Sequence, residues 1–209
     1  MNNAKLIIVS APSGCGKGTI LAEVFKNTDA YFSVSCTTRK PREGEEDGVN
    51  YFFVTQEKFD EMAANNEFLE YAQFVGKSYG TPEKPINDAL SQGRDAILEI
   101  ETKGAYLVKQ KRPDSVSIFI IPPSIKELDR RLHKRATESD DVIAKRVAQS
   151  AEEIAKSGTY DYIIMNDALE DAVRDFELIL SSVKANDNRA DKFKAENMKE
   201  LTREVLENA

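Results

Sequence analysis

Four apolar runs rich in β-branched residues recur along the chain. They are residues 5–10 (KLIIVS), 95–100 (DAILEI), 115–121 (SVSIFII) and 160–165 (YDYIIM). Continuous apolar runs of this length are typical of strands buried on both faces, as in a parallel sheet. Segments with helical periodicity lie between or after them, at 17–27, 102–111, 124–136 and 168–185. The alternation predicts an α/β fold with a mostly parallel sheet core flanked by helices, which binds ligands at the carboxyl ends of its strands.

Two regions interrupt this alternation. Residues 35–81 combine short alternating strands (51–54 and 68–75), an arginine-rich turn and a short helix at 56–65, which predicts an inserted antiparallel lobe. Residues 125–157 form two helical stretches joined by a polar turn, and Ile143, Val147 and Ile154 give the second one an apolar stripe. The chain ends in a predicted charged amphipathic helix at 189–208.

No repeat or low-complexity linker separates these regions, so we expect one domain over residues 1–209. Its core would comprise residues 1–34, 82–124 and 158–209, with 35–81 and 125–157 as insertions. A chain of 209 residues is long enough for one substantial domain of this kind.

Composition narrows the class of partner. The net charge of −7 and the pI near 5.0 argue against a nucleic-acid-binding surface. No apolar run approaches the roughly 20 residues of a membrane span, and the N-terminus lacks the pattern of a signal peptide. The two cysteines lie in unlike contexts, which indicates reduced thiols. We therefore expect a cytoplasmic protein without nucleic-acid or membrane partners; its oligomeric state stays open.

Residues 11–19, APSGCGKGT, follow the first apolar run directly and resemble a phosphate-binding loop. They depart from the pattern G-x-x-x-x-G-K-[ST], with Ala11 for the first glycine and Gly18 for the hydroxyl residue. Gly14 and Gly16 allow backbone N–H groups to face an anion, and the following helix presents its positive end. Lys17 adds a cation that can reach the terminal phosphates of a nucleoside triphosphate. The alternative is an ordinary glycine turn with a solvated lysine.

A second anion site is indicated by an arginine-rich turn. Arg39 and Arg42 flank Pro41, which stiffens the turn, and two forked guanidiniums suit bidentate capture of a phosphate. Tyr51 and Tyr79 can each donate a further O–H to the same anion. An exposed basic turn is the alternative.

Taken together, these motifs resemble the guanylate kinase family. The motifs are APSGCGKGT, S-x-T-T-R-x-P-R-x-G-E-x-x-G-x-x-Y-x-F (35–53), EFLEYAQFVGKSYGTP (67–82), LEIETKGA (98–105), DRRLHKR (129–135) and YDYIIMND (160–167). The resemblance spans about residues 4 to 184, and the block at 35–53 is highly specific because adenylate and uridylate kinases lack it. It implies a P-loop kinase in which residues 35–81 form a GMP-binding lobe and residues 125–157 a helical lid.

The resemblance also implies the site residues. ATP would be bound by Ala11, Pro12, Ser13, Gly14, Cys15, Gly16, Lys17, Gly18, Thr19, Arg131, Arg135 and Asn166, with Asp167 nearby. GMP would be bound by Ser35, Arg39, Arg42, Tyr51, Glu70, Tyr79, Thr81, Glu99 and Glu101, with Glu99 in a supporting role. Lys17, Arg39, Arg131, Arg135 and Arg146 would be catalytic, and Mg²⁺ would be held mostly by phosphates and water, with Thr19 as the candidate protein ligand.

Base chemistry fits this assignment. Guanine offers N1–H and N2–H₂ donors that a carboxylate accepts, whereas adenine lacks N1–H and would leave a buried carboxylate unpaired. For Glu70 and Glu101 the alternative is a solvated residue at a strand or its end. For Arg131, which shares a helix face with Arg135, the alternative is surface pairing with Glu127 at i, i+4. The chain also has Ala136 where the family usually has glycine.

The expected reaction is ATP-dependent phosphorylation of GMP, and of dGMP, to the diphosphate, a step of purine nucleotide metabolism and GMP recycling. Two competitors remain: a kinase of the same fold acting on another phosphorylated small molecule, and a non-catalytic phosphopeptide-binding domain. An intact Gly16–Lys17 and the complete Tyr51, Glu70, Tyr79 and Thr81 set argue against both.

Overall fold

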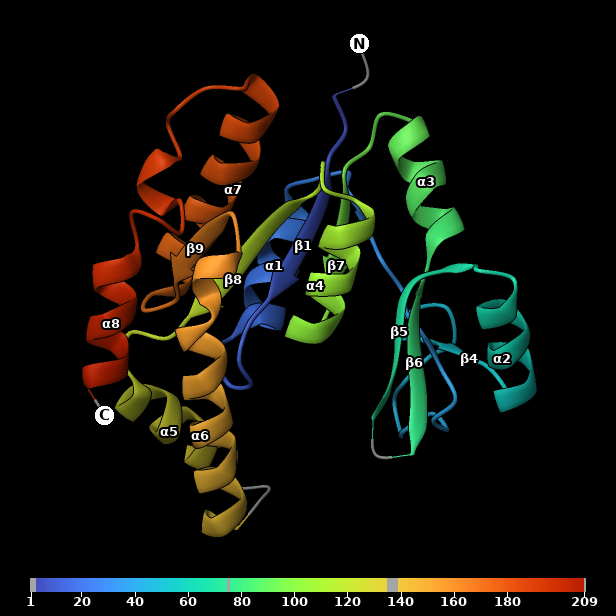
Figure 1. Cartoon of the computed structure of the whole chain (residues 1–209), viewed down its shortest axis with the longest axis horizontal. Coiled ribbons are helices and arrows are strands. Elements are labelled where there is room, and N and C mark those ends of the chain that lie inside the picture. Colours follow the sequence, from blue (N-terminus) through green and yellow to red (C-terminus); the bar gives the residue numbers. More distant parts are fainter. Residues whose placement is uncertain (1–2, 75, 135–138, 209) are drawn as a thin grey trace. The chain divides into compact units, whose positions relative to one another are not determined.

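The computed structural model describes residues 3–74, 76–134 and 139–208, and the chain divides into two compact units (Figure 1). The first unit comprises Met1–Ile8 and Asp29–Ser115, and the second comprises Val9–Thr28 and Val116–Ala209. Strand β1 (Leu6–Ser10) contributes residues to both units. The domain boundaries expected from the sequence follow another division and stay a prediction.

The main sheet has the strand order β2-β7-β1-β8-β9. In the first unit, β2 (Tyr31–Phe32) pairs in parallel with β7 (Ala96–Glu99). In the second, β8 (Val116–Ile121) pairs in parallel with β9 (Tyr162–Met165). All five residues of β1 are buried, as are five of the six in β8, which explains their continuous apolar sequences. The α/β fold with a mostly parallel sheet flanked by helices is confirmed.

The first unit also contains a four-stranded sheet with the order β4-β3-β6-β5. Strands β3 (Cys36–Thr37), β6 (Lys77–Pro82) and β5 (Phe68–Phe74) pair antiparallel in turn, but β4 (Phe52–Phe53) lies parallel to β3. The expected antiparallel lobe is therefore a mixed sheet. The turn-rich segment after β3 is long enough to bring the chain back in the same direction, as a parallel pair requires.

Three helices belong to this unit. Helix α2 (Gln56–Ala64) begins after Thr55, whose hydroxyl caps it by accepting from the Lys58 N–H. Phe59 of α2 stacks on Phe68 and packs with Cys36 in the core of the four-stranded sheet. Helices α3 (Glu83–Ser91) and α4 (Thr102–Lys111) precede and follow β7.

The second unit is built mainly from helices around β8 and β9. They are α1 (Lys17–Lys26), α5 (Ile125–Lys134), α6 (Asp140–Ala155), α7 (Leu169–Ala185) and α8 (Lys199–Glu207), with short 3₁₀ turns η1 (Ser157–Thr159) and η2 (Asp191–Phe193). Phe119 and Ile163 pack with Ile154 in one buried cluster, and Val147 lies against it, so the apolar stripe predicted for α6 faces the core. Helix α7 packs against α1 (Figure 1).

The expected continuous helix at 189–208 is wrong, because only 199–207 is α-helical. Before α8, the chain forms η2 and then pairs with β9: Lys194 makes an antiparallel bridge with Tyr162, and the Ala195 N–H donates to the Asp161 carbonyl at 3.1 Å. Phe193 and Ala195 are buried. Backbone pairing with the strand and burial of these apolar side chains outweigh the helical preference of the charged sequence.

Among the described residues, no helix has both the length and the apolar character needed to cross a membrane.

Candidate nucleotide-binding site

The phosphate loop of the second unit has the backbone that its sequence predicts. Strand β1 ends at Ser10, helix α1 begins at Lys17, and Gly14 and Gly16 adopt positive φ angles of 94° and 79°. This left-handed conformation favours glycine at both positions. Ala11 has no positive φ, so replacing the usual first glycine there carries no backbone strain. The N-terminal end of α1, with its positive dipole end, therefore follows a turn suited to binding an anion.

Neighbouring side chains also explain the two glycines. A Cβ atom on Gly16 would collide with the Asn166 carboxamide, whose Nδ2 donates to the Cys15 carbonyl at 2.7 Å. A Cβ atom on Gly14 would lie 2.9 Å from Leu128 of α5. The loop is thus fixed from two sides, by the residue after β9 and by α5. Such preorganisation lowers the cost of binding a phosphate.

Cys15, inside the loop, has no nucleophilic character. Its side chain is fully buried, and burial raises the pKa of the thiol to about 12. Because the thiolate is the reactive form, Cys15 stays a small apolar residue of the loop.

Two of the expected lid arginines lie against this loop. Arg131 of α5 donates from Nη1 to the Asn166 carbonyl at 3.0 Å and from Nε to Glu127 at 2.8 Å. Arg146 of α6 donates from Nη2 to the Ser13 hydroxyl. The ion pair between Glu127 and Arg131 at i, i+4 is present as well. Arg131 therefore forms the pair with Glu127 and also lies at the loop. Arg135 and Ala136 lie outside the described residues.

A hollow of about 590 Å³ opens at the loop. It is lined by Gly14, Glu127, Arg130, Arg131, Lys134 and Asp167. Its size is within the ~300–1,000 Å³ of typical ligand pockets. Three cations beside the loop suit a polyphosphate. Hydrogen bonds from Arg130 and then Arg131 lower the pKa of Glu127 to about 2, which keeps this carboxylate ionised and the arginines paired.

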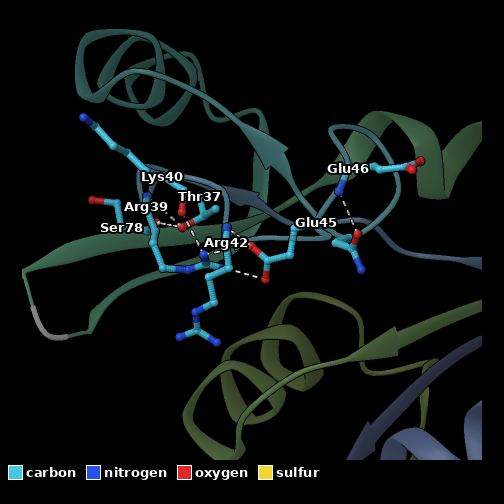
Figure 2. A network of polar contacts seen from close by, with 8 residues as sticks. Thr37, Arg39, Lys40, Arg42, Glu45, Glu46 and Ser78 are labelled. Atoms are coloured by element: carbon cyan, nitrogen blue, oxygen red, sulfur yellow. Dashed lines mark hydrogen bonds and ion pairs between the residues drawn. The ribbon is translucent and has the colours of Figure 1, made fainter.

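The first unit carries the second anion site, on the turn after β3 (Figure 2). Arg39 donates from Nη1 and Nη2 to the two carboxylate oxygens of Glu45, each at 2.9 Å, and only 16% of its side chain is exposed. Its guanidinium lies 5.3 Å from the centre of the Tyr51 ring, and Tyr51 packs edge-on against Tyr79 at 6.1 Å. The hydrogen bond to Glu45 is the main reason that the pKa of Arg39 is raised, and Tyr79 makes a smaller contribution.

Arg42 belongs to the same turn but points elsewhere. Its backbone N–H donates to Glu45 at 2.8 Å, while its guanidinium points away from that carboxylate (Figure 2). Glu45 therefore holds Arg39 by its side chain and the turn at Arg42 by its backbone. The structure brings together Arg39, Tyr51 and Tyr79, and leaves the charged end of Arg42 outside this cluster.

A partly buried carboxylate lies on the neighbouring hairpin. Glu70 of β5 is paired across the strands with Thr81 of β6, whose hydroxyl donates to Glu70 Oε1 at 2.6 Å. Thr81 is fully buried, and burial raises the pKa of Glu70 above its usual value, against smaller opposing effects of Thr81 and Lys111. Glu70 is thus partly buried and hydrogen-bonded within the protein, unlike the solvated strand residue that was the alternative.

The remaining acceptor-side residues are more dispersed. Ser35 precedes β3, and its carbonyl accepts from the Phe52 N–H at 2.9 Å. Glu99 ends β7 and Glu101 precedes α4, both with exposed side chains. Their positions at and just after the carboxyl end of β7 fit the expectation that ligands gather at the carboxyl ends of strands.

Several site residues had no role in our sequence-based assignment. Glu45 lies within the specific block at 35–53, but sequence alone does not show that it pairs with Arg39. Arg130 and Lys134 are four residues apart and so share one face of α5. Gly104 of α4 lies against Glu70, and its only sequence signal is a glycine inside a helical stretch.

A glycine-rich loop between a buried strand and a helix, flanked by arginines, defines a nucleotide-binding P-loop protein of the α/β class. The family model of guanylate kinase matches residues 3–183. The chain belongs to the guanylate kinase family.

Individual proteins similar to this chain are also guanylate kinases. The chain is 49% identical to a guanylate kinase of Carboxydothermus hydrogenoformans over 90% of its length and 93% of the relative. It is 45% identical to a guanylate kinase of Thermus thermophilus, over 88% of its length and 84% of the relative. The crystal structure of guanylate kinase from Anaplasma phagocytophilum superposes with a TM-score of 0.70 at 34% identity, covering 87% of this chain and 86% of that one.

Proposed function

We propose that the protein transfers the γ-phosphoryl group of ATP to GMP, and to dGMP, forming ADP and the nucleoside diphosphate. The observation that carries the choice of acceptor is the partly buried Glu70 carboxylate, paired with the buried Thr81 on the hairpin β5–β6. A buried carboxylate has to be matched by donors, and guanine supplies N1–H and N2–H₂ on one edge. Adenine has neither N1–H nor N2–H₂, so the part of the Glu70 carboxylate that Thr81 does not bind would lack these donors.

The acceptor phosphate is assigned to the arginine turn. Arg39, already oriented by Glu45 and backed by Tyr51, would bind this phosphate together with Arg42 and the hydroxyls of Tyr51 and Tyr79. Ser35, Glu99 and Glu101 would complete the acceptor side, with Glu99 in support. On this assignment residues 35–81 form the GMP-binding lobe of the first unit.

ATP phosphates are assigned to the loop of the second unit. Residues 11–19 would surround them with backbone N–H groups, Lys17 would neutralise their charge, and Asn166 would hold the loop. Arg131 and Arg146, with Arg135 outside the described residues, would stabilise the charge on the phosphoryl group in transfer. Residues 125–157 would act as the lid.

Mg²⁺ fits this donor side as a companion of ATP. Among the described residues, no three His, Cys, Asp or Glu side chains form a group that could hold a metal ion. Phosphate oxygens and water are the ligands that Mg²⁺ prefers, and Thr19 is the one protein ligand we assign. When bound, the ion would supply positive charge to the phosphates.

The chemistry needs no general base. An ionised oxygen of the GMP phosphate attacks the γ-phosphorus in line, and the bond from phosphorus to the β,γ-bridging oxygen breaks to release ADP. Catalysis then depends on positioning, charge neutralisation and exclusion of water, which are the tasks assigned above.

A coupled assay of ADP release with GMP, dGMP, AMP and UMP tests the proposal. We expect kcat/KM for GMP and dGMP to exceed that for AMP and UMP by at least about 10⁴-fold, as buried polar readout of a base allows. AMP turned over as well as GMP would refute the assigned acceptor. No ADP release with any nucleotide would favour a binding domain without catalysis.

A further inference from the structure

Glycine occupies an unusual position in α4. Gly104 is the third of ten residues of this helix and is buried. Glycine is among the least favourable residues for a helix, and its φ here is not in the left-handed region, so the backbone does not require it. A reason for the glycine therefore has to come from what surrounds it.

The nearest atoms belong to the Glu70 carboxyl group. A Cβ atom on Gly104 would lie 2.9 Å from Oε2, 3.2 Å from Cδ and 3.5 Å from Cγ of Glu70. The first of these separations is shorter than real Cβ atoms tolerate, so one partner has to move. Since the obstructing group is the end of a long side chain, the carboxylate would move more easily than the helix.

Little freedom is left to that carboxylate. Its other oxygen, Oε1, accepts from the Thr81 hydroxyl at 2.6 Å, and the residue is partly buried. Thr81 on one side and the bare backbone of Gly104 on the other define its place. A methyl group at position 104 would force Glu70 into another rotamer and away from Thr81.

We propose that Gly104 is a specificity-determining positioning residue, whose missing side chain leaves the space in which Glu70 is held to read the acceptor base. The inference rests on the proposed role of Glu70 in recognising guanine. It assigns Gly104 no contact with the nucleotide itself, because its effect passes through the carboxylate.

Four variants test this: Gly104→Ala, Glu70→Ala, the double variant, and Gly158→Ala as control. Gly158 also lacks a positive φ, and a Cβ atom there meets nothing within 4 Å. Steady-state kinetics with GMP and ATP and thermal melting are measured for each. We expect G104A to lower kcat/KM for GMP about tenfold or more through KM, as loss of a hydrogen bond to a charged group allows, with KM for ATP unchanged.

Two further readouts separate positioning from packing. On the E70A background, adding G104A should not lower the melting temperature, because alanine favours the helix and no carboxylate has to move. On the E70A background, G104A should change kcat/KM for GMP by less than about twofold, since no carboxylate remains to be displaced.

The other outcomes would contradict either the role of Gly104 or the proposed role of Glu70. An unchanged kcat/KM in G104A, an equal loss on both backgrounds, or a lowered melting temperature on both backgrounds would overturn the role of Gly104. If E70A itself kept the kcat/KM of the parent for GMP, the proposed reading of guanine by Glu70 would fail, and the inference with it. A loss in E70A with none in G104A would remove only the inference.

Discussion

Glu45 is connected to both halves of the arginine turn, although it faces no assigned part of the nucleotide. Its two carboxylate oxygens accept from both terminal nitrogens of Arg39, and one also accepts from the Arg42 N–H. Bidentate pairing fixes the plane of a guanidinium, and an arginine oriented beforehand loses less entropy when a phosphate binds. At the scale of single residues, Glu45 is therefore expected to contribute to GMP affinity through Arg39.

We predict that Glu45→Gln raises KM for GMP about tenfold and leaves KM for ATP unchanged. The amide keeps one acceptor oxygen but loses the charge and the second acceptor, so Arg39 is oriented less well. Glu46→Gln is the matched control, because Glu46 is exposed and its contacts with Asn50 run through the Glu46 backbone: its N–H donates to Asn50 Oδ1 at 2.9 Å and its carbonyl accepts from the Asn50 N–H at 3.1 Å. Equal effects of E45Q and E46Q in initial-rate kinetics would show that local charge, and not the pair with Arg39, matters.

The sequence indicated which side chains could bind a phosphate, but it did not indicate which side chains these residues pair with. The block at 35–53 indicates Arg39 and Arg42 together, whereas the structure holds one in a tight pair and turns the other away (Figure 2). That difference arises because the turn brings Glu45, six residues after Arg39, back beside the Arg39 guanidinium. Side-chain contacts across a turn are set by backbone geometry that no residue pattern encodes.

At the scale of elements, the sequence predicted the buried strands. It did not predict short elements or elements that depend on contacts with other parts of the chain. Continuous apolar runs marked β1, β7, β8 and β9 because both of their faces are covered. Helix α3 was not predicted; it contains Pro85, which lies in the first turn, where its missing N–H is not needed. Strands β2 and β3, two residues each, are too short for periodicity to reveal.

Elements also explain how the phosphate loop keeps its shape. The residue after β9, Asn166, reaches the loop through its side chain and Arg131 of α5 through its carbonyl. One residue thus links a strand end, the loop and helix α5 within the second unit. Its carboxamide is buried, so removing it leaves the Cys15 carbonyl without this donor.

We predict that Asn166→Ala raises KM for ATP about tenfold, the equivalent of about 1.4 kcal/mol, and leaves KM for GMP within about twofold. Asn197→Ala is the matched control. Asn197 also donates from Nδ2 to a backbone carbonyl at 2.7 Å, that of Asp191, but at an exposed position in the chain segment before α8. Kinetics with each substrate varied in turn would check the prediction; an N166A effect confined to GMP would contradict the assignment of Asn166 to the donor side.

At the scale of the whole molecule, the residues that we assign to ATP and to GMP fall in different units of the chain. Residues 11–19, Arg131, Arg146 and Asn166 all belong to the second unit, and every residue assigned to GMP belongs to the first. The sequence indicated both sets, but it did not indicate this correspondence, because each unit is assembled from segments distant in the chain. If the two sets act as assigned, a change in one should leave binding at the other intact.

Lys17→Ala examines that separation directly. Lys17 begins α1 in the second unit and is assigned to the ATP phosphates, so its loss should lower kcat by about 10²–10³-fold, the range found when one electrostatic contact to a transition state is removed. GMP binding, measured by calorimetry without ATP, should stay within about twofold of the parent, since Arg39, Glu70 and Thr81 are untouched. Glu70→Ala should show the reverse pattern in binding, with GMP affinity reduced and ATP affinity retained. Loss of GMP binding in K17A would mean that the acceptor side requires the donor loop, whereas unchanged turnover would refute the role of Lys17 in transfer.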